Sequence, residues 1–253
     1  MIDIHCHILP YIDDGAKNMD EAIKMCAIAR DNGVNKIIVT PHVACLDDVD
    51  SFLGERDVLI EELREALASC NIDVEIYPGA ELYVNEDVFF SGDLTKLTLN
   101  GSKYILVEFD FYGLTPNKIT SYLVEIRNFG LIPIVAHPER YEYMQEDYNF
   151  INFLSDRGVL FQVNMNNIVS RGSRPEYVLA RELVRKRVAT FIASDAHSAE
   201  YRSNNLRDMI EGAPNGFDID EKFFLNEMPQ IILDNGDIPA IKREKVVASR
   251  RMR

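Results

Sequence analysis

Short apolar runs rich in β-branched residues alternate with amphipathic segments along the chain. Each run is hydrophobic enough for a strand that is buried on both faces, as parallel sheets require. Seven such runs lie at residues 2–8, 36–43, 74–82, 104–109, 132–137, 160–164 and 189–197. The alternation predicts repeated βα units.

The segments between these runs have helical periodicity. Asn18 and Glu21 resemble a capping box with Asn18 as the N-cap, and Gly33 is well placed just past the end of the same helix. A second helix carries one apolar stripe, formed by Phe52, Leu59, Ile60, Leu63 and Leu67. Further helices are expected at residues 117–128, 148–156 and 175–185.

All five histidines lie at the ends of predicted strands. His5 and His7 are two residues apart, so both imidazoles project to one face while Cys6 faces the layer between strand and helix. The other three, each at the end of another run, are His42, His137 and His197. Structural histidines would be scattered over helix surfaces, linkers and tails. The observed placement therefore predicts one shared metal site.

Carboxylates occupy equivalent strand ends. These are Glu81, Glu108 and Asp195, and the pair Asp13-Asp14 lies in the loop after the first run. A carboxylate can bridge two cations, which a neutral imidazole cannot, and Glu81 is the candidate bridge. Glu108 could instead belong to a buried ion pair, and Asp13-Asp14-Gly15 could be an ordinary turn. Of the two aspartates, Asp14 is the favoured ligand.

Two arginines stand near the same strand ends. Arg140 follows His137 by three residues, and Arg202 follows His197 by five. A guanidinium offers a planar, bidentate match to phosphoryl oxygens, so the pair indicates a phosphate substrate. The alternative is that both arginines form ion pairs that stabilise loops of an acidic protein. Two asparagines at a strand end, Asn164 and Asn166, could line the pocket but carry no specific signal.

The spread of these residues indicates the architecture. Ligands that converge from nearly every strand end are typical of a closed barrel, whose C-terminal rim surrounds the axis. An open, doubly wound sheet would gather them at one switch point. We therefore expect a single α/β domain of 253 residues, built as a closed barrel, with a solvated basic tail at residues 242–253.

Composition excludes several classes. The formal net charge of −14 argues against non-specific nucleic-acid binding. No segment is long and apolar enough to span a membrane, and no signal peptide is recognisable, so we expect a cytoplasmic protein. The cysteines, which we expect in the core, are Cys6, Cys26, Cys45 and Cys70. None has an arginine six residues later, which excludes the C-x5-R loop of cysteine-based phosphatases.

Together these motifs resemble the PHP (polymerase and histidinol phosphatase) superfamily. The resemblance rests on the initial His-x-His, Thr40-Pro41-His42, Gly79-Ala80-Glu81, Glu108, His137-Pro138-Glu139-Arg140 and Ser194-Asp195-Ala196-His197. Within the superfamily, the opening Met-Ile-Asp-Ile-His-Cys-His followed by Asp13-Asp14-Gly15 is most similar to the bacterial manganese-dependent tyrosine-protein phosphatases of capsular and exopolysaccharide gene clusters.

This resemblance implies a distorted, seven-stranded (β/α)7 barrel with three divalent metal ions, manganese first, with iron or zinc as alternatives. The implied ligands are His5, His7, Glu81 and Asp195 for the first ion, Glu81, Glu108 and His137 for the second, and Asp14, His42 and His197 for the third. Arg140 and Arg202 match arginines expected to bind the substrate phosphate. The implied substrate is phosphotyrosine on the tail of a bacterial tyrosine autokinase that controls polysaccharide assembly.

The expected reaction is metal-assisted hydrolysis of a phosphate monoester without a covalent phosphoenzyme, with His42 as one candidate proton donor. The rivals are a histidinol-phosphate or other small-molecule phosphatase of the same superfamily, an amidohydrolase, and a non-catalytic metal-binding module. Amidohydrolases usually place a metal-bridging lysine where this chain has Glu81 or Glu108, and the full set of ligands argues against a degenerate module. Whether identical chains associate stays open.

Overall fold

The computed structural model describes residues 1–44, 49–91, 93–214 and 217–247. Its strands are β1 (Ile2–Cys6), β2 (Lys36–Val39), β3 (His42–Val43), β4 (Glu75–Tyr77), β5 (Glu81–Tyr83), β6 (Tyr104–Glu108), β7 (Ile132–Ala136), β8 (Leu160–Asn164) and β9 (Phe191–Ala193). All pairs are parallel, in one sheet of order β1-β2-β4 and another of order β3-β5-β6-β7-β8-β9.

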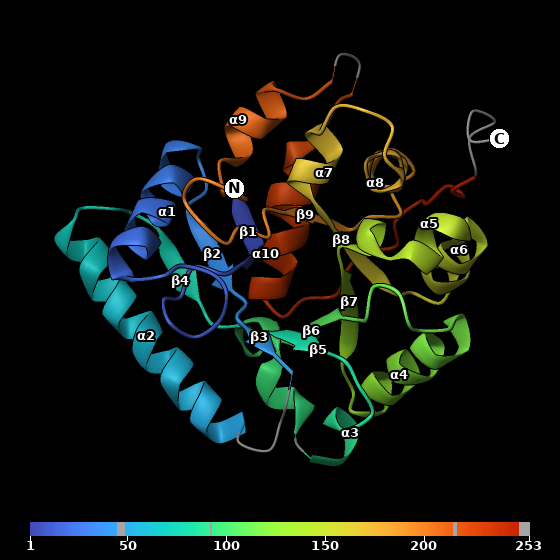
Figure 1. Cartoon of the computed structure of the whole chain (residues 1–253), viewed down its shortest axis with the longest axis horizontal. Coiled ribbons are helices and arrows are strands. Elements are labelled where there is room, and N and C mark those ends of the chain that lie inside the picture. The colour runs from blue at the N-terminus through green and yellow to red at the C-terminus, as the bar shows by residue number, and fades with distance from the viewer. Residues whose placement is uncertain (45–48, 92, 215–216, 248–253) are drawn as a thin grey trace.

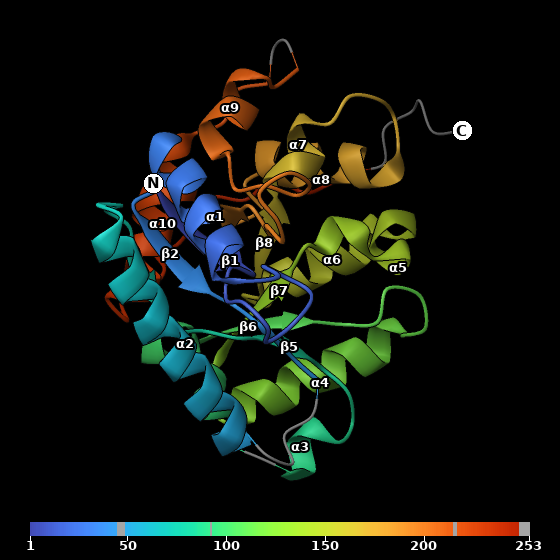
Figure 2. The same ribbon diagram turned by 60° about the vertical axis from the view of Figure 1, so that its left-hand side comes forward.

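Helices surround the strands (Figure 1). They are α1 (Met19–Asp31), α2 (Val49–Ser69), α3 (Val88–Ser91), α4 (Pro116–Asn128), α5 (Glu142–Glu146), α6 (Tyr148–Asp156), α7 (Met165–Val169), α8 (Pro175–Arg185), α9 (Leu206–Glu211) and α10 (Met228–Leu233). Short 3-10 helices span Leu94–Leu97, Leu99–Gly101 and Pro138–Arg140, and a π-helix spans Phe223–Glu227. The first two long helices, α1 and α2, lie side by side in both views (Figures 1 and 2). None of the described helices is long and apolar enough to cross a membrane.

The two sheets form one closed ring. β2 and β3 are consecutive parts of one chain run, as are β4 and β5, so the nine strands make seven runs. β1 meets β9 through the bridge between Cys6 and Ala196 and through hydrogen bonds from His7 N to Ala196 O and from Asp195 N to His5 O, both 2.9 Å long. This connectivity confirms the expected seven-stranded α/β barrel.

Two of the predicted runs are interrupted, which differs from the expectation of continuous strands. The run 36–43 breaks at Thr40-Pro41, and the run 74–82 breaks at residues 78–80. Pro41 and Pro78 have no N–H to donate to a neighbouring strand, which accounts for both breaks.

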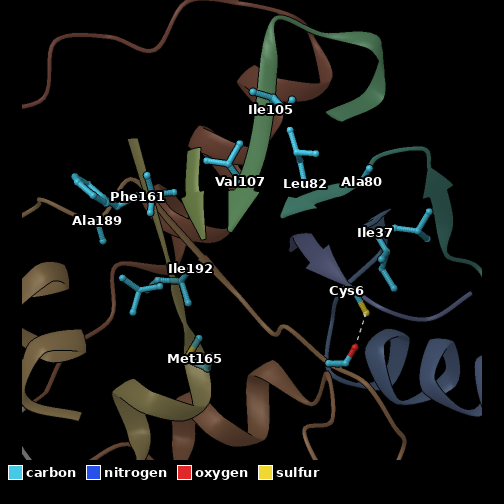
Figure 3. Close-up of a cluster of buried hydrophobic side chains, with 14 of the residues drawn as sticks. Cys6, Ile37, Ala80, Leu82, Ile105, Val107, Phe161, Met165, Ala189 and Ile192 are labelled. Atoms are coloured by element: carbon cyan, nitrogen blue, oxygen red, sulfur yellow. Dashed lines mark hydrogen bonds between the residues drawn. The ribbon is translucent and has the colours of Figure 1, made fainter. Parts of the chain in front are cut away.

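Alternation along the strands separates two apolar layers. In β6, Ile105 and Val107 join the outer cluster between strands and helices, whereas Tyr104 and Leu106 join the inner cluster inside the barrel. Figure 3 shows part of the outer layer, with Ile105 and Val107 among its labelled side chains. Continuing the inner alternation of β6 by two residues leads to Glu108. The inner face is therefore apolar low in the barrel and polar at the C-terminal strand ends.

β1 departs from strict alternation. Ile2 and Ile4 pack in the inner cluster, yet Cys6 packs in the outer one. The pairing of β1 with β2 has a register irregularity between Asp3 and Cys6, which accounts for the change of face. This shift brings His5 to the inner side, directly above the apolar layer.

The predicted helix ends are largely confirmed. The Asn18 side chain accepts a hydrogen bond from Glu21 N, and Gly33 has a φ of +80° after the end of α1. The Glu21 carboxylate accepts from Lys17 N rather than from the N-cap itself. α6 and α8 have the predicted bounds, and α4 begins at Pro116 because Thr115 caps it.

The expectation that all cysteines are buried is wrong for Cys70, which is exposed. The chain leaves α2 at this point, and Asn71 takes a left-handed conformation with a φ of 55°, so Cys70 does not continue the apolar stripe. Cys6 and Cys26 are buried as predicted, and Cys45 lies outside the described residues.

Residues 242–247 of the predicted solvated tail are mostly exposed, but their backbone is attached to the barrel rather than frayed. Val246 is buried, and its backbone N–H and C=O both bond the side chain of Asn152, at 2.9 and 2.8 Å. Lys245 also forms an ion pair with Asp156. These contacts hold the segment against α6, while residues 248–253 lie outside the described part of the chain.

Candidate metal centre

The structure brings all the predicted ligand side chains together at one rim of the barrel. His42 and Glu81 begin β3 and β5, just after the breaks in their runs, and Asp14 lies in the loop after β1. Each predicted ligand belongs to a group whose ligand atoms lie within 4.8 Å of one another. The groups are His7, Asp14, His42 and His197; His5, His7 and Glu81; His5, His137 and Asp195; and His42, Glu81 and Glu108. Convergence of so many donors on one rim is what a closed barrel makes available.

Glu81 lies at the centre of the cluster. Its buried Oε2 is 3.1 Å from His5 Nε2, 3.3 Å from His7 Nε2 and 3.2 Å from His42 Nδ1. Within the described part of the chain no hydrogen bond reaches this oxygen. Glu81 Oε1 is 3.1 Å from His137 Nε2, so the two oxygens face different histidines. This arrangement suits a carboxylate that bridges two cations.

Three further donor atoms, from His5, His7 and Asp195, lie on the same side of the cluster as Glu81 Oε2. His5 Nε2 and His7 Nε2 are 3.1 Å apart, and they lie 3.4 and 3.5 Å from Asp195 Oδ1. Ligands about 2.1 Å from an ion at the corners of a tetrahedron are about 3.4 Å from one another. The spacing of these donors therefore fits a divalent cation.

The electrostatic field at this point favours a positive charge. Burial lowers the pKa of His7, but the hydrogen bond to Asp13 and the nearby Glu81 carboxylate outweigh it and raise the pKa to about 10. Burial likewise acts to raise the pKa of Glu81, yet the neighbouring imidazoles hold it well below its ordinary value. A metal ion can supply the positive charge that a proton supplies otherwise.

A second set of donors lies on the other side of Glu81. Glu108 Oε1 is 3.5 Å from His137 Nε2. Burial and the nearby Glu81 raise the pKa of Glu108 to about 8, and burial lowers the pKa of His137, which keeps its imidazole in the neutral form that binds metals. His137 and Asp195 have positive φ angles of 32° and 52°, a strained conformation that turns both side chains off the ends of their strands.

The loop after β1 supplies a third set. Asp14 Oδ1 lies 3.5 Å from His42 Nε2 and 3.4 Å from His197 Nε2. Asp13 has another role, because its Oδ2 accepts hydrogen bonds from His7 Nδ1 at 2.8 Å and from His42 N at 3.1 Å. The geometry therefore favours Asp14 as a ligand and Asp13 as the residue that orients His7.

Two side-chain amides of β8 orient the ligands; sequence reasoning missed Gln162 and named Asn164 only as a residue that could line the pocket. Gln162 Oε1 lies 2.8 Å from His5 Nδ1, and Gln162 Nε2 donates to Asn164 Oδ1 at 2.9 Å. Asn164 Nδ2 in turn donates to Asp195 Oδ2 at 2.6 Å. The available signal was the spacing of two polar residues, two apart, in a run that is otherwise apolar.

The two predicted arginines meet at Asp195 Oδ2, the oxygen that also accepts a hydrogen bond from Asn164. Arg202 Nη2 lies 2.5 Å, and Arg140 Nη1 3.6 Å, from Asp195 Oδ2. The Arg140 guanidinium also lies over the ring of Phe111, 4.5 Å from its centroid. Both arginines line a cavity of about 480 Å³. Both arginines therefore form ion pairs, as the alternative interpretation expected. Their partner, however, is a candidate metal ligand beside an open cavity, and not a residue of a surface loop.

Comparison with known proteins identifies the family. A family model described as "Capsular polysaccharide synthesis, CpsB/CapC" matches residues 1–236. The chain belongs to this family. Among curated members of similar sequence, the tyrosine-protein phosphatase YwqE of Bacillus subtilis (strain 168) is 30% identical over 244 residues, covering 94% of this chain and 91% of YwqE. The tyrosine-protein phosphatase CpsB of Streptococcus pneumoniae is 29% identical over 215 residues, covering 80% of this chain and 85% of CpsB.

A solved structure of the CpsB/CapC family matches the whole barrel. It comes from crystal structures of YwqE from Bacillus subtilis and CpsB from Streptococcus pneumoniae, described as unique metal-dependent tyrosine phosphatases. The TM-score is 0.81 at 27% identity, with 98% of this chain and 100% of that chain covered. A lactonase from Listeria monocytogenes, with a TM-score of 0.53, 7% identity and coverage of 93% of this chain and 91% of the lactonase, shares the fold alone.

Proposed function

We propose that this chain is a metal-dependent tyrosine-protein phosphatase that acts in capsular polysaccharide synthesis. The observation that carries the proposal is the meeting of Arg140 and Arg202 at Asp195, beside a cluster of imidazole and carboxylate donors. Phosphate monoesters need both kinds of group, because their oxygens bind cations and guanidinium forks at the same time. The names of the related proteins support the same activity.

The proposed cofactors are three divalent ions, manganese first, held by the three ligand sets that the resemblance implies. The donor spacing around Glu81 supports the first two sets, and the approach of Asp14 to His42 and His197 supports the third. Bound divalent ions would act as Lewis acids toward the phosphate and make water more acidic. Mixed nitrogen and oxygen donors also accept iron or zinc according to supply.

The protein's own residues position the phosphate. Arg140 and Arg202 would bind its non-bridging oxygens, and the Phe111 ring holds the Arg140 guanidinium in place. Water then attacks phosphorus in line with the tyrosine oxygen, the phosphorus–oxygen bond to the ring breaks, and tyrosine and inorganic phosphate leave. Both nitrogens of His42 face carboxylates, Nδ1 toward Glu81 and Nε2 toward Asp14, which favours a ligand role over proton donation.

We further propose that the substrate phosphotyrosine lies on the tail of a bacterial tyrosine autokinase that regulates capsule or exopolysaccharide synthesis. The phenolate of tyrosine has a conjugate acid with a pKa of about 10, so it leaves more readily than an alkoxide. The buried thiols do not compete as nucleophiles, since burial raises the pKa of Cys6 well above its ordinary value and that of Cys26 to about 12.

The test is phosphate release from a phosphotyrosine peptide by wild type, His42→Ala and Arg140→Ala, with bound metal measured on the same samples. We expect a chelator to abolish activity and manganese to restore it. Arg140→Ala should keep its metal and lose about a hundredfold in kcat/KM, because one charged donor to the transferred group is gone. His42→Ala should lose both metal and activity.

Arg157→Ala serves as the matched control, because Arg157 follows α6 and lines neither the cavity nor the ligand cluster. Histidinol phosphate tested in parallel separates this function from that of a small-molecule phosphatase. Full activity in a metal-free sample would contradict the proposal. So would an Arg140→Ala enzyme as active as the Arg157→Ala control.

A further inference from the structure

The cavity beside the candidate metal centre is longer than the phosphate site. Its inner end is formed by Arg140, Arg202 and Asn164, all of which contact Asp195. The cavity continues outward along the first turns of α7 and α8 and the loop after β6. Its volume of about 480 Å³ is within the range of pockets that bind molecules of drug size, well above the need of a phosphate group.

The outer part is lined by side-chain amides whose roles differ. Gln145 Nε2 donates to Glu139 O at 2.7 Å, and Asn167 Nδ2 donates to Glu139 Oε1 at 3.0 Å. These two amides are held in place by the protein. The side-chain oxygen of Asn166, on the first turn of α7, is buried and has no hydrogen-bond partner among the described residues. This oxygen has almost no accessible surface, so a ligand in the cavity reaches it only when the Asn166 amide turns toward the cavity that the side chain lines. An acceptor that lacks a partner inside the protein gains a hydrogen bond from such a turn.

Two tyrosines flank this part of the cavity. Tyr112 is 78% exposed, but its loop is fixed because Asp110 Oδ1 accepts hydrogen bonds from Tyr112 N at 2.8 Å and Gly113 N at 2.6 Å. Tyr177 lies on the first turn of α8, with the Arg174 guanidinium 5.8 Å from its ring centroid. Two aromatic side chains with polar tips, combined with an unmet acceptor, suit a ligand that offers apolar surface and N–H groups together.

We propose that this cavity binds the polypeptide that flanks the phosphotyrosine, and that Asn166 accepts a hydrogen bond from a backbone N–H of the substrate. The inference rests on the proposed phosphatase function and adds the reason for preferring a protein substrate. A polypeptide supplies N–H donors at regular spacing, which a small phosphate ester does not. Tyr112 and Tyr177 pack against the neighbouring substrate side chains.

The experiment compares two substrates, a short phosphotyrosine peptide and p-nitrophenyl phosphate, on the manganese-loaded enzyme. The quantity measured is the ratio of kcat/KM for the peptide to kcat/KM for p-nitrophenyl phosphate. We expect Asn166→Ala to lower this ratio about tenfold, mainly through the KM of the peptide, because one hydrogen bond to the peptide is lost. Asn149→Ala, an exposed asparagine on α6, is the matched control and should keep the wild-type ratio.

A second pair of variants tests the opposite wall. Tyr177→Ala should lower the ratio as well, and Tyr177→Phe, which keeps the ring, should restore it. A ratio within twofold of wild type in both Asn166→Ala and Tyr177→Ala overturns the proposal, whether or not the absolute rates change. If wild type releases phosphate from neither substrate, the phosphatase function itself fails, an outcome distinct from an unchanged ratio.

Discussion

His5 offers two ring nitrogens, and Gln162 decides which one faces Glu81. Gln162 Oε1 lies 2.8 Å from His5 Nδ1 and accepts a hydrogen bond from Nδ1–H, which leaves the lone pair of the neutral imidazole on Nε2. The amide cannot turn over easily, because its other end donates to Asn164. Asn164 in turn binds one oxygen of Asp195 and leaves the other toward His5 and His7. Two neutral side chains of β8 thus orient one ligand from β1 and one that follows β9.

Replacing Gln162 should weaken metal binding. In Gln162→Leu the acceptor for His5 Nδ1–H is lost, and we expect an affinity for manganese about 10- to 100-fold lower. Gln162→Glu, which keeps an acceptor oxygen, should recover part of the loss. Titration of the metal-free protein with manganese measures the effect, and Gln230→Leu on α10 is the control. Equal manganese affinities in wild type and Gln162→Leu would contradict the proposed role of Gln162 in orienting His5.

Among single residues of the site, the sequence predicted the roles of histidines and carboxylates better than those of neutral amides. Ligand candidates were recognisable because histidines and carboxylates rarely end several buried strands by chance. Gln162 and Asn164, two residues apart in β8, gave only a weak signal, since polar residues in a buried strand have many explanations. The choice between Asp13 and Asp14 depended on how the loop folds back over His7, which local sequence does not specify.

The break between β4 and β5 depends on close packing around Gly79. A Cβ at this position would lie 2.8 Å from Ile38 Cγ2 and 2.9 Å from Val39 O. Gly79 O also accepts a hydrogen bond from the buried Arg56, at 3.2 Å. The glycine lets the chain bend against β2, so that Glu81 begins β5 directly beside the histidines.

Gly79→Ala should therefore destabilise the fold. Backbone and neighbouring side chains would have to move, and we expect a loss of about 1–3 kcal/mol in the free energy of unfolding. Gly54→Ala is the matched control, because Gly54 lies in α2 with no atom within 4 Å of an added Cβ. That change should raise stability by up to about 1 kcal/mol. Urea unfolding of both variants gives the comparison, and a stable Gly79→Ala would refute the packing argument.

Among the elements, periodicity predicted the long helices well and the strand breaks poorly. α6 and α8 have the expected bounds because their apolar stripes and flanking residues agree. The runs around Pro41 and Pro78 looked continuous because apolar residues stand on both sides of each proline. Short elements such as α10, whose Met228 and Ile232 pack into the inner cluster, contain too few residues to show a helical period in the sequence.

The barrel brings several carboxylates together at one rim. Glu81, Glu108, Asp14 and Asp195 crowd the rim, and the chain as a whole carries a formal net charge of −14. Repulsion among these groups opposes folding unless cations offset it. We therefore expect bound metal to contribute to the stability of the barrel as well as to chemistry.

Removal of metal should lower the melting temperature of the wild-type chain. Free manganese at 100 to 1,000 times its dissociation constant stabilises a one-site protein by about 3–4 kcal/mol, and several sites add to this. Thermal unfolding with excess chelator and with excess manganese measures the shift. Glu81→Gln should show a much smaller difference between the two conditions. Identical melting temperatures for the wild type in both would contradict metal binding at the rim.

The closed barrel could be predicted from the sequence because the candidate metal ligands are spread over most of the predicted strands. Ligands spread over several strand ends indicated a ring, and the ring is present. The exact closure could not be predicted, because β1 and β9 meet over only a few residues and through an irregular strand.

That closure has a consequence for synthesis on the ribosome. β1 is made first, but its partner Ala196 lies 190 residues further along the chain than Cys6. His5 and His7 must therefore wait, without their companions Asp195 and His197, until β9 has left the exit tunnel. Until then the nascent chain has an open row of strands and an incomplete set of donors. Ring closure therefore comes late in translation, and so does completion of the proposed first and third ligand sets, which need Asp195 and His197.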